Sequence, residues 1–70
     1  MSNPEIKKKI LSLLQKGYPK DFNIQEIADE VEIHRNTVST YVKVLVAEGK
    51  LKISRTMGKI TLYTFVKKDV

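Results

Sequence analysis

The chain has 70 residues, of which 41% are hydrophobic and 30% are charged, and it contains no cysteine. So short a polymer buries only about 60% of the surface of its unfolded chain, and we therefore expect a single domain over residues 1–70. The lack of cysteine excludes a disulfide framework and a thiolate zinc site, which fits a reducing, cytoplasmic location. The apolar run that ends at Leu14 is broken by Ser12 and is too short for a secretory signal or a membrane span.

Positive charge is concentrated in the second half of the chain. The formal net charge is +5, but residues 1–32 hold five basic and six acidic side chains, whereas residues 33–68 hold eight basic side chains and one acidic one, Glu48. A surface of mostly one sign attracts polyanions, and nucleic acid is the commonest such partner of a small cytoplasmic protein. A surface that merely keeps the chain soluble is the alternative interpretation.

A first helix is predicted to begin at Pro4, because Asn3 can cap it and Glu5 lies near the positive end of its dipole. Its apolar residues recur at helical spacing: Ile6, Ile10, Leu13 and Leu14. Gly17 is expected to end this helix in a left-handed conformation, and Pro19 prevents any continuation.

Two shorter helices are predicted next. Asn23 and Glu26 have the spacing of a capping box, so the second helix begins at Ile24 and ends before Glu32. The third helix is closed by Gly49. Its core-facing residues recur at helical spacing: Val38, Val42 and Leu45.

A β-hairpin is predicted after the helices. From Lys50 the pattern alternates, so that Leu51 and Ile53 share one face of a strand. Met57-Gly58 is expected to supply the turn, and the second strand runs from Ile60 to Val66. The order of helix, helix, helix and hairpin indicates an α+β fold.

The segment from Ile24 to Gly49 resembles the helix-turn-helix of winged-helix regulators such as the MarR, ArsR and TrmB-like families. The residues that carry this resemblance are Ile24-Gln25-Glu26-Ile27-Ala28, Ile33, Arg35-Asn36-Thr37-Val38-Ser39 and Leu45-Val46-Ala47-Glu48-Gly49. With the hairpin, the resemblance covers residues 4–66 and implies a winged helix-turn-helix, in which three helices precede a β-hairpin wing.

Two positions depart from the family pattern. Glu32 stands where these families usually have a glycine in the tight turn, and we therefore expect a longer turn. His34 replaces the usual serine or threonine cap of the recognition helix, which leaves His34 or Asn36 as the cap.

The resemblance implies a sequence-specific double-stranded DNA-binding protein that acts as a transcription regulator. The recognition helix, about residues 35–48, would lie in the major groove, and the wing, about residues 51–66, on adjacent backbone or the minor groove. Projection opposite the apolar stripe leaves five side chains of the recognition helix outward: Arg35, Asn36, Ser39, Thr40 and Lys43. Arg55 and Lys59 flank the tip of the wing and complete the expected DNA-binding set.

Other functions have weaker support in the sequence. We expect no enzyme, no cofactor and no small-molecule ligand, because His34 is the only histidine and no nucleophile or phosphate loop is evident. RNA binding lacks an exposed platform of stacking aromatic residues. The main alternative is a winged-helix protein-protein interaction module without DNA binding. Surplus apolar residues predict an exposed patch and a homodimer: Val44, Val46, and either Leu62 with Val66 or Tyr63 with Phe65.

Overall fold

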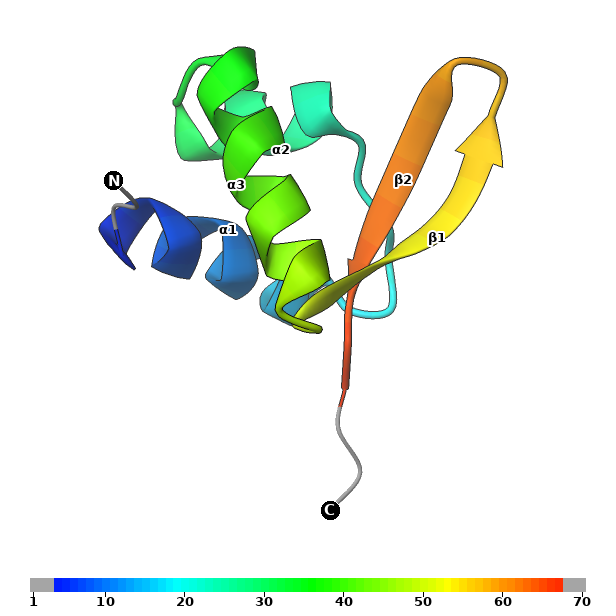
Figure 1. Ribbon diagram of the computed structural model, residues 1–70, viewed down its shortest axis with the longest axis horizontal. Coiled ribbons are helices and arrows are strands. Elements are labelled where there is room, and N and C mark those ends of the chain that lie inside the picture. The colour runs from blue at the N-terminus through cyan, green and yellow to red at the C-terminus, as the bar shows by residue number, and fades with distance from the viewer. Residues whose placement is uncertain (1–3, 68–70) are drawn as a thin grey trace.

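The computed structural model describes residues 4–67, which form three helices followed by an antiparallel hairpin (Figure 1). The elements are α1 (Pro4–Gly17), α2 (Ile24–Val31), α3 (Arg35–Ala47), β1 (Leu51–Met57) and β2 (Ile60–Phe65). This order confirms the predicted winged-helix fold. The expected cap Asn3 lies outside the described residues. Within residues 4–67, no helix combines the length and the apolar character needed to cross a membrane.

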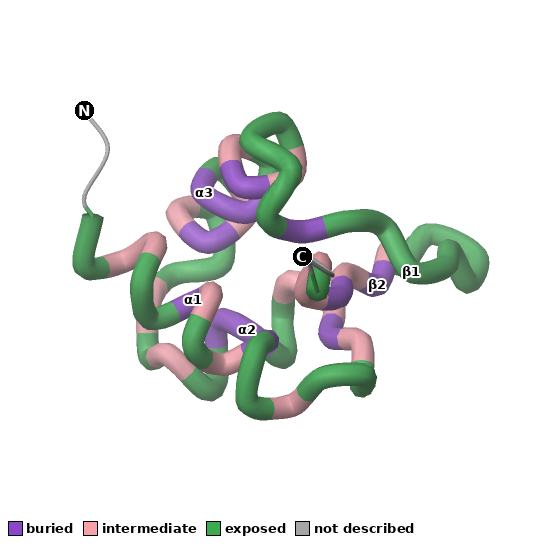
Figure 2. The backbone as a smooth tube through the Cα atoms, turned by 90° about the horizontal axis from the view of Figure 1, so that it is seen from below, coloured by how far each residue is buried: buried purple, intermediate pink, exposed green. Residues whose placement is uncertain are grey.

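The core lies where the apolar stripes of the three helices meet the base of the hairpin. Figure 2 shows the buried segments of the helices facing one another, whereas most of β1 is exposed. The largest fully buried side chains are Ile10, Leu14, Ile27, Val38, Val42, Leu45 and Leu51. Burial of one such side chain stabilises the fold by about 1.5–3 kcal/mol. Tyr41, only 9% exposed, belongs to this core although the sequence did not indicate it.

The expected apolar patch is in a different place. Val44 and Val46 are half-buried, and Val46 packs against the core. On β2, Leu62 is buried, while Tyr63 and Phe65 also pack against the core, so neither of the two expected outward pairs is fully exposed. The exposed large apolar side chains are instead Tyr18, Ile53, Met57 and Ile60, three of which lie on the hairpin.

The end of α1 differs from the prediction. Gly17 remains helical and has no positive φ, so the expected left-handed stop is wrong. A Cβ atom at Gly17 would lie 2.8 Å from two ring carbons of Phe22. Glycine is therefore needed for the close approach of this ring. Phe22 in turn exchanges backbone hydrogen bonds of 2.8 and 2.7 Å with Tyr63, which joins the loop before α2 to the free edge of β2.

The turn after α2 is short, and the expectation of a longer turn is wrong. The capping box starts α2 as predicted, with Asn23 Oδ1 accepting from the Glu26 backbone at 2.7 Å. Glu32 ends it with φ 57° and ψ 45°, in the left-handed region. Its backbone N–H and that of Ile33 both donate to the carbonyl of Ala28. These hydrogen bonds hold the glutamate in a conformation that usually favours glycine.

The hairpin closes with a two-residue turn, Gly58-Lys59, one position later than predicted. Gly58 has φ 62°, which glycine adopts at little cost, and Met57 pairs directly with Ile60. The register shifts between Ile53 and Arg55, as in a β-bulge. Leu51 is buried but Ile53 is 56% exposed, because β1 leaves the helices soon after it begins (Figure 1).

Candidate nucleic-acid interface

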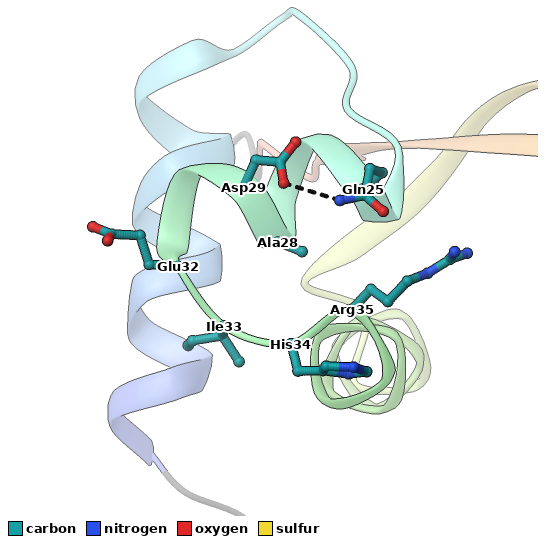
Figure 3. A pocket seen from close by; sticks show the side chains of 7 residues that line it. All are labelled: Gln25, Ala28, Asp29, Glu32, Ile33, His34 and Arg35. Carbon is teal, nitrogen blue, oxygen red and sulfur yellow. Dashed lines mark hydrogen bonds between the residues drawn. The ribbon is translucent and has the colours of Figure 1, made fainter.

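The first turn of α3 is fixed by a histidine cap. His34 Nδ1 accepts a hydrogen bond of 3.1 Å from the backbone N–H of Asn36, so His34, and not Asn36, is the cap. Arg35 is the first residue of the helix. Figure 3 shows that the side chains of Arg35 and Glu32 extend from the turn in opposite directions. The cap thus places a cation at the head of α3, away from the carboxylate of the turn.

The outward face of α3 carries the five predicted side chains. Arg35, Asn36, Thr40 and Lys43 are exposed, and Ser39 is half-buried. The Thr40 hydroxyl donates to the backbone carbonyl of Asn36 at 3.1 Å, so its proton is used within the helix. Arg35, Asn36 and Lys43 therefore supply the stronger donors of this face.

A groove separates the head of α3 from the wing. Arg35 lines it from the helix side and Lys59 from the tip of the wing. Polar groups of Gln25, Thr61 and Tyr63 lie in the same wall. The full lining comprises Asn23, Ile24, Gln25, Arg35, Lys59, Ile60, Thr61 and Tyr63. Because the lining contains two cations and no carboxylate, the groove favours an anion.

A second hollow, at the turn between α2 and α3, has the opposite character. Asp29 and Glu32 line it together with Arg35 (Figure 3). Gln25 Nε2 donates to Asp29 Oδ1 at 2.9 Å and keeps this carboxylate on the surface of α2. A lining with two carboxylates and one arginine does not favour an anion. Arg35 therefore marks the boundary between an acidic surface and the basic groove.

Arg55 and Lys59 have different environments, although the sequence placed them on either side of one tip. Lys59 belongs to the turn itself, whereas Arg55 lies opposite Leu62 in the strand pairing. Arg55 Nε donates to Asp21 Oδ2 at 3.0 Å. A hydrogen bond from Ser54, followed by the charge of Arg55, lowers the pKa of the Asp21 carboxyl. Asp21 thus balances part of the Arg55 charge and ties the wing to the loop before α2.

Comparisons with known proteins agree with this geometry. The family model described as an HTH domain matches residues 7–60, which is most of the chain. The chain belongs to this helix-turn-helix family of DNA-binding domains. No curated protein matches it significantly.

One solved structure similar to this HTH domain is described as "Structural insights into the DNA recognition and protein interaction domains reveal fundamental homologous DNA pairing properties of HOP2". Its TM-score is 0.77 at 23% sequence identity, and the match covers 87% of this chain and 98% of the other. At this identity the similarity supports the winged-helix fold alone. The narrower resemblance to MarR, ArsR and TrmB-like regulators stays a prediction.

The sequence did not indicate the contribution of α2 and β2 to the groove. Gln25 was expected only as part of the helix-turn-helix, and Tyr63 only as a member of one possible outward pair, yet both line the groove beside Arg35. Their positions depend on how the wing is joined to the loop before α2, which the bridge between Phe22 and Tyr63 sets. The one available signal was the polar character of Gln25 at the start of α2.

Proposed function

We propose that this HTH domain is a sequence-specific double-stranded DNA-binding protein that acts as a transcription regulator without a cofactor. In this proposal α3 enters the major groove, and the wing contacts the adjacent backbone or the minor groove. The observation that carries the proposal is the groove that Arg35 and Lys59 line without a carboxylate. One phosphate backbone always separates a major groove from the neighbouring minor groove, and a cationic groove between the two DNA-contacting elements suits that backbone.

The proposal gives the two elements different roles. Arg35 and Asn36 lie in the first turn of α3, the part of a recognition helix that approaches base edges, and both side chains can make paired hydrogen bonds with bases. Ser39 and Lys43 follow on the same outward face and reach bases or phosphates, whereas the Thr40 hydroxyl, which donates to Asn36, can accept from a base. Their positions fit a helix that enters the groove by its N-terminal half.

The wing residues would mainly supply charge. Lys59 is exposed at the turn and can approach a phosphate without rearrangement. Arg55 is also exposed, but its bond to Asp21 must loosen or be shared when it contacts DNA. Contacts with phosphates position a protein on DNA and carry little sequence information. We therefore assign affinity to the wing and base readout to α3.

A homodimer is part of the same proposal, since many regulators of this fold bind two half-sites with two-fold symmetry. The proposed contacts are the outer face of the hairpin and the chain ends, of which residues 1–3 and 68–70 lie outside the described residues. Sedimentation at micromolar concentration should show a dimer, with DNA or without it. A monomer under both conditions would remove the dimer from the proposal and leave DNA binding intact.

Amide chemical shifts measured during titration with a short duplex test which face binds. We expect the largest changes in the first half of α3, in the Gly58-Lys59 turn and at Gln25. The exposed lysines of α1, Lys8 and Lys9, serve as an internal control, because they are cationic but lie on another element. Changes confined to α1, or no changes with DNA, would contradict the proposal and favour the protein-interaction module.

A further inference from the structure

The wing ends in a pair of exposed apolar side chains. Met57 and Ile60 lie directly opposite each other in the strand pairing and are 56% and 50% exposed. Of the two turn residues that join them, Gly58 has no side chain and Lys59 is exposed, so the turn leaves the pair open to solvent. Isolated apolar residues on a surface are common, but two adjacent ones at the most projecting point of a domain form a contact surface.

The surroundings of this pair are cationic. Residues 51–67 contain the basic side chains of Lys52, Arg55, Lys59 and Lys67 and no aspartate or glutamate. Lys59 lies in the turn between the two apolar residues, directly before Ile60. A matching partner therefore presents negative charge around an apolar interior. The minor groove of DNA does so where a base step is partly unstacked, because phosphates border the groove and the opened step exposes the apolar faces of its bases.

The tip also lies on the side of the molecule where DNA is proposed to bind. Ile60 lines the same groove as Arg35. Figure 1 shows the tip of the hairpin and the first turn of α3 at the same end of the molecule, with α1 toward the other end. A duplex held against α3 would therefore meet the tip of the wing.

The base of the wing is attached to the rest of the fold. Leu62, two residues after Ile60 on the same face of β2, is only 8% exposed. Phe22, in the loop before α2, pairs with β2. These contacts limit how far the hairpin can bend away when it is pressed against DNA.

We propose that Met57 and Ile60 form an apolar wedge that enters the minor groove and partly unstacks one base step, while Lys59 contacts a flanking phosphate. This inference rests on the proposed DNA binding and adds a distortion of the DNA to it. Methionine and isoleucine are among the apolar side chains that proteins insert between base steps, and this insertion kinks the DNA. Pyrimidine-purine steps unstack most easily, so the wedge selects TA or CA/TG steps beneath the wing.

Two duplexes of about 20 bp, long enough for two turns of DNA, provide the test. One duplex carries TA steps at the positions under the wing, and the other carries an A-tract there. Each duplex has 2-aminopurine at these positions, and a donor dye and an acceptor dye at its two ends. The test variant is the double substitution Met57→Thr and Ile60→Thr, since threonine retains β propensity. The control is Ile53→Thr, because Ile53 is as exposed as Met57 but lies away from the tip.

The wild type and the Ile53→Thr control should raise 2-aminopurine fluorescence, because the base step unstacks, and should shorten the distance between the dyes, because the DNA bends. Both proteins should bind the TA duplex about tenfold more tightly than the A-tract duplex. The double variant should bind both duplexes with the same salt dependence as the wild type, because Lys59 remains. It should not unstack or bend either duplex. Circular dichroism must first show that all three proteins fold.

Equal fluorescence and bending with the wild type and the double variant would overturn the wedge while leaving DNA binding in place. If the double variant no longer self-associates and the wild type does not alter the shape of the DNA, the wedge is wrong and the tip is a protein contact. A wild type that binds neither duplex at low salt would contradict the proposed function itself and the wedge with it.

Discussion

Arg35 at the start of α3 and Lys59 at the tip of the wing line one groove, although most of α3 and all of β1 separate them in the chain. The relationship means that a duplex can engage both residues at once. It also predicts that the two make separable contributions to binding, because one can reach base edges and the other is suited to phosphate.

Replacement of Arg35 by alanine should narrow the difference in affinity between a selected site and random DNA by about 1–3 kcal/mol, the range for a lost bidentate base contact. Replacement of Lys59 by alanine should weaken binding to both DNAs alike. Fluorescence anisotropy with a site selected from a random library measures both effects. If the Lys59 variant loses sequence preference while a folded Arg35 variant keeps it, the assignment of base readout to α3 is wrong.

Glu32 offers a test of the turn between α2 and α3. Glu32→Gly should raise the free energy of unfolding by about 0.5–1 kcal/mol, because glycine adopts a φ of 57° without the cost that a side chain adds. Glu30→Gly is the matched control within α2 and should lower the free energy of unfolding by about 1 kcal/mol. Urea denaturation of the two variants measures the difference. Equal destabilisation would show that Glu32 is not left-handed in solution.

Asp21 and Glu48 should make the fold sensitive to acid. A hydrogen bond from Ser54 and the charge of Arg55 lower the pKa of Asp21, and a hydrogen bond from Lys7, with the charges of Lys7 and Lys50, lowers the pKa of Glu48. Because both pKa values are lower in the folded chain, their stabilisation is present above the unfolded values and is lost as the pH falls below about 4.

The thermal midpoint should therefore fall between about pH 5 and pH 3, and Asp21→Asn should make that fall shallower. Melting curves followed by circular dichroism at a series of pH values test this. Glu30→Gln is the control, since no salt bridge involving Glu30 is found in the described part of the chain. An identical pH dependence in the wild type and the Asp21 variant would show that the Asp21 contacts do not stabilise the fold.

Local patterns predicted most of the fold. Helical periodicity gave the three helices, and the spacing of Asn23 and Glu26 gave the start of α2. The errors arose where a residue responds to distant partners. Gly17 is required by the ring of Phe22, and Ile53 is exposed because β1 leaves the helical core.

Only part of the candidate site could be predicted, because the rest also depends on contacts between residues that are distant in the chain. Projection of α3 gave its outward face, since that depends on one helix. The groove beside Arg35 and the pairing of Arg55 with Asp21 depend on how the wing packs, which periodicity does not describe. Packing of the wing also decides that Lys59, more than Arg55, is available to a phosphate.

The most direct test of the account is a titration of duplex DNA at several salt concentrations. If the chain neutralises about four phosphates, the logarithm of the association constant should fall with the logarithm of salt concentration with a slope of about −3.6. Lys59→Ala should reduce its magnitude by about 0.9. A slope near zero, or no binding at low salt by the folded chain, would contradict the proposal that this HTH domain binds DNA through α3 and its wing.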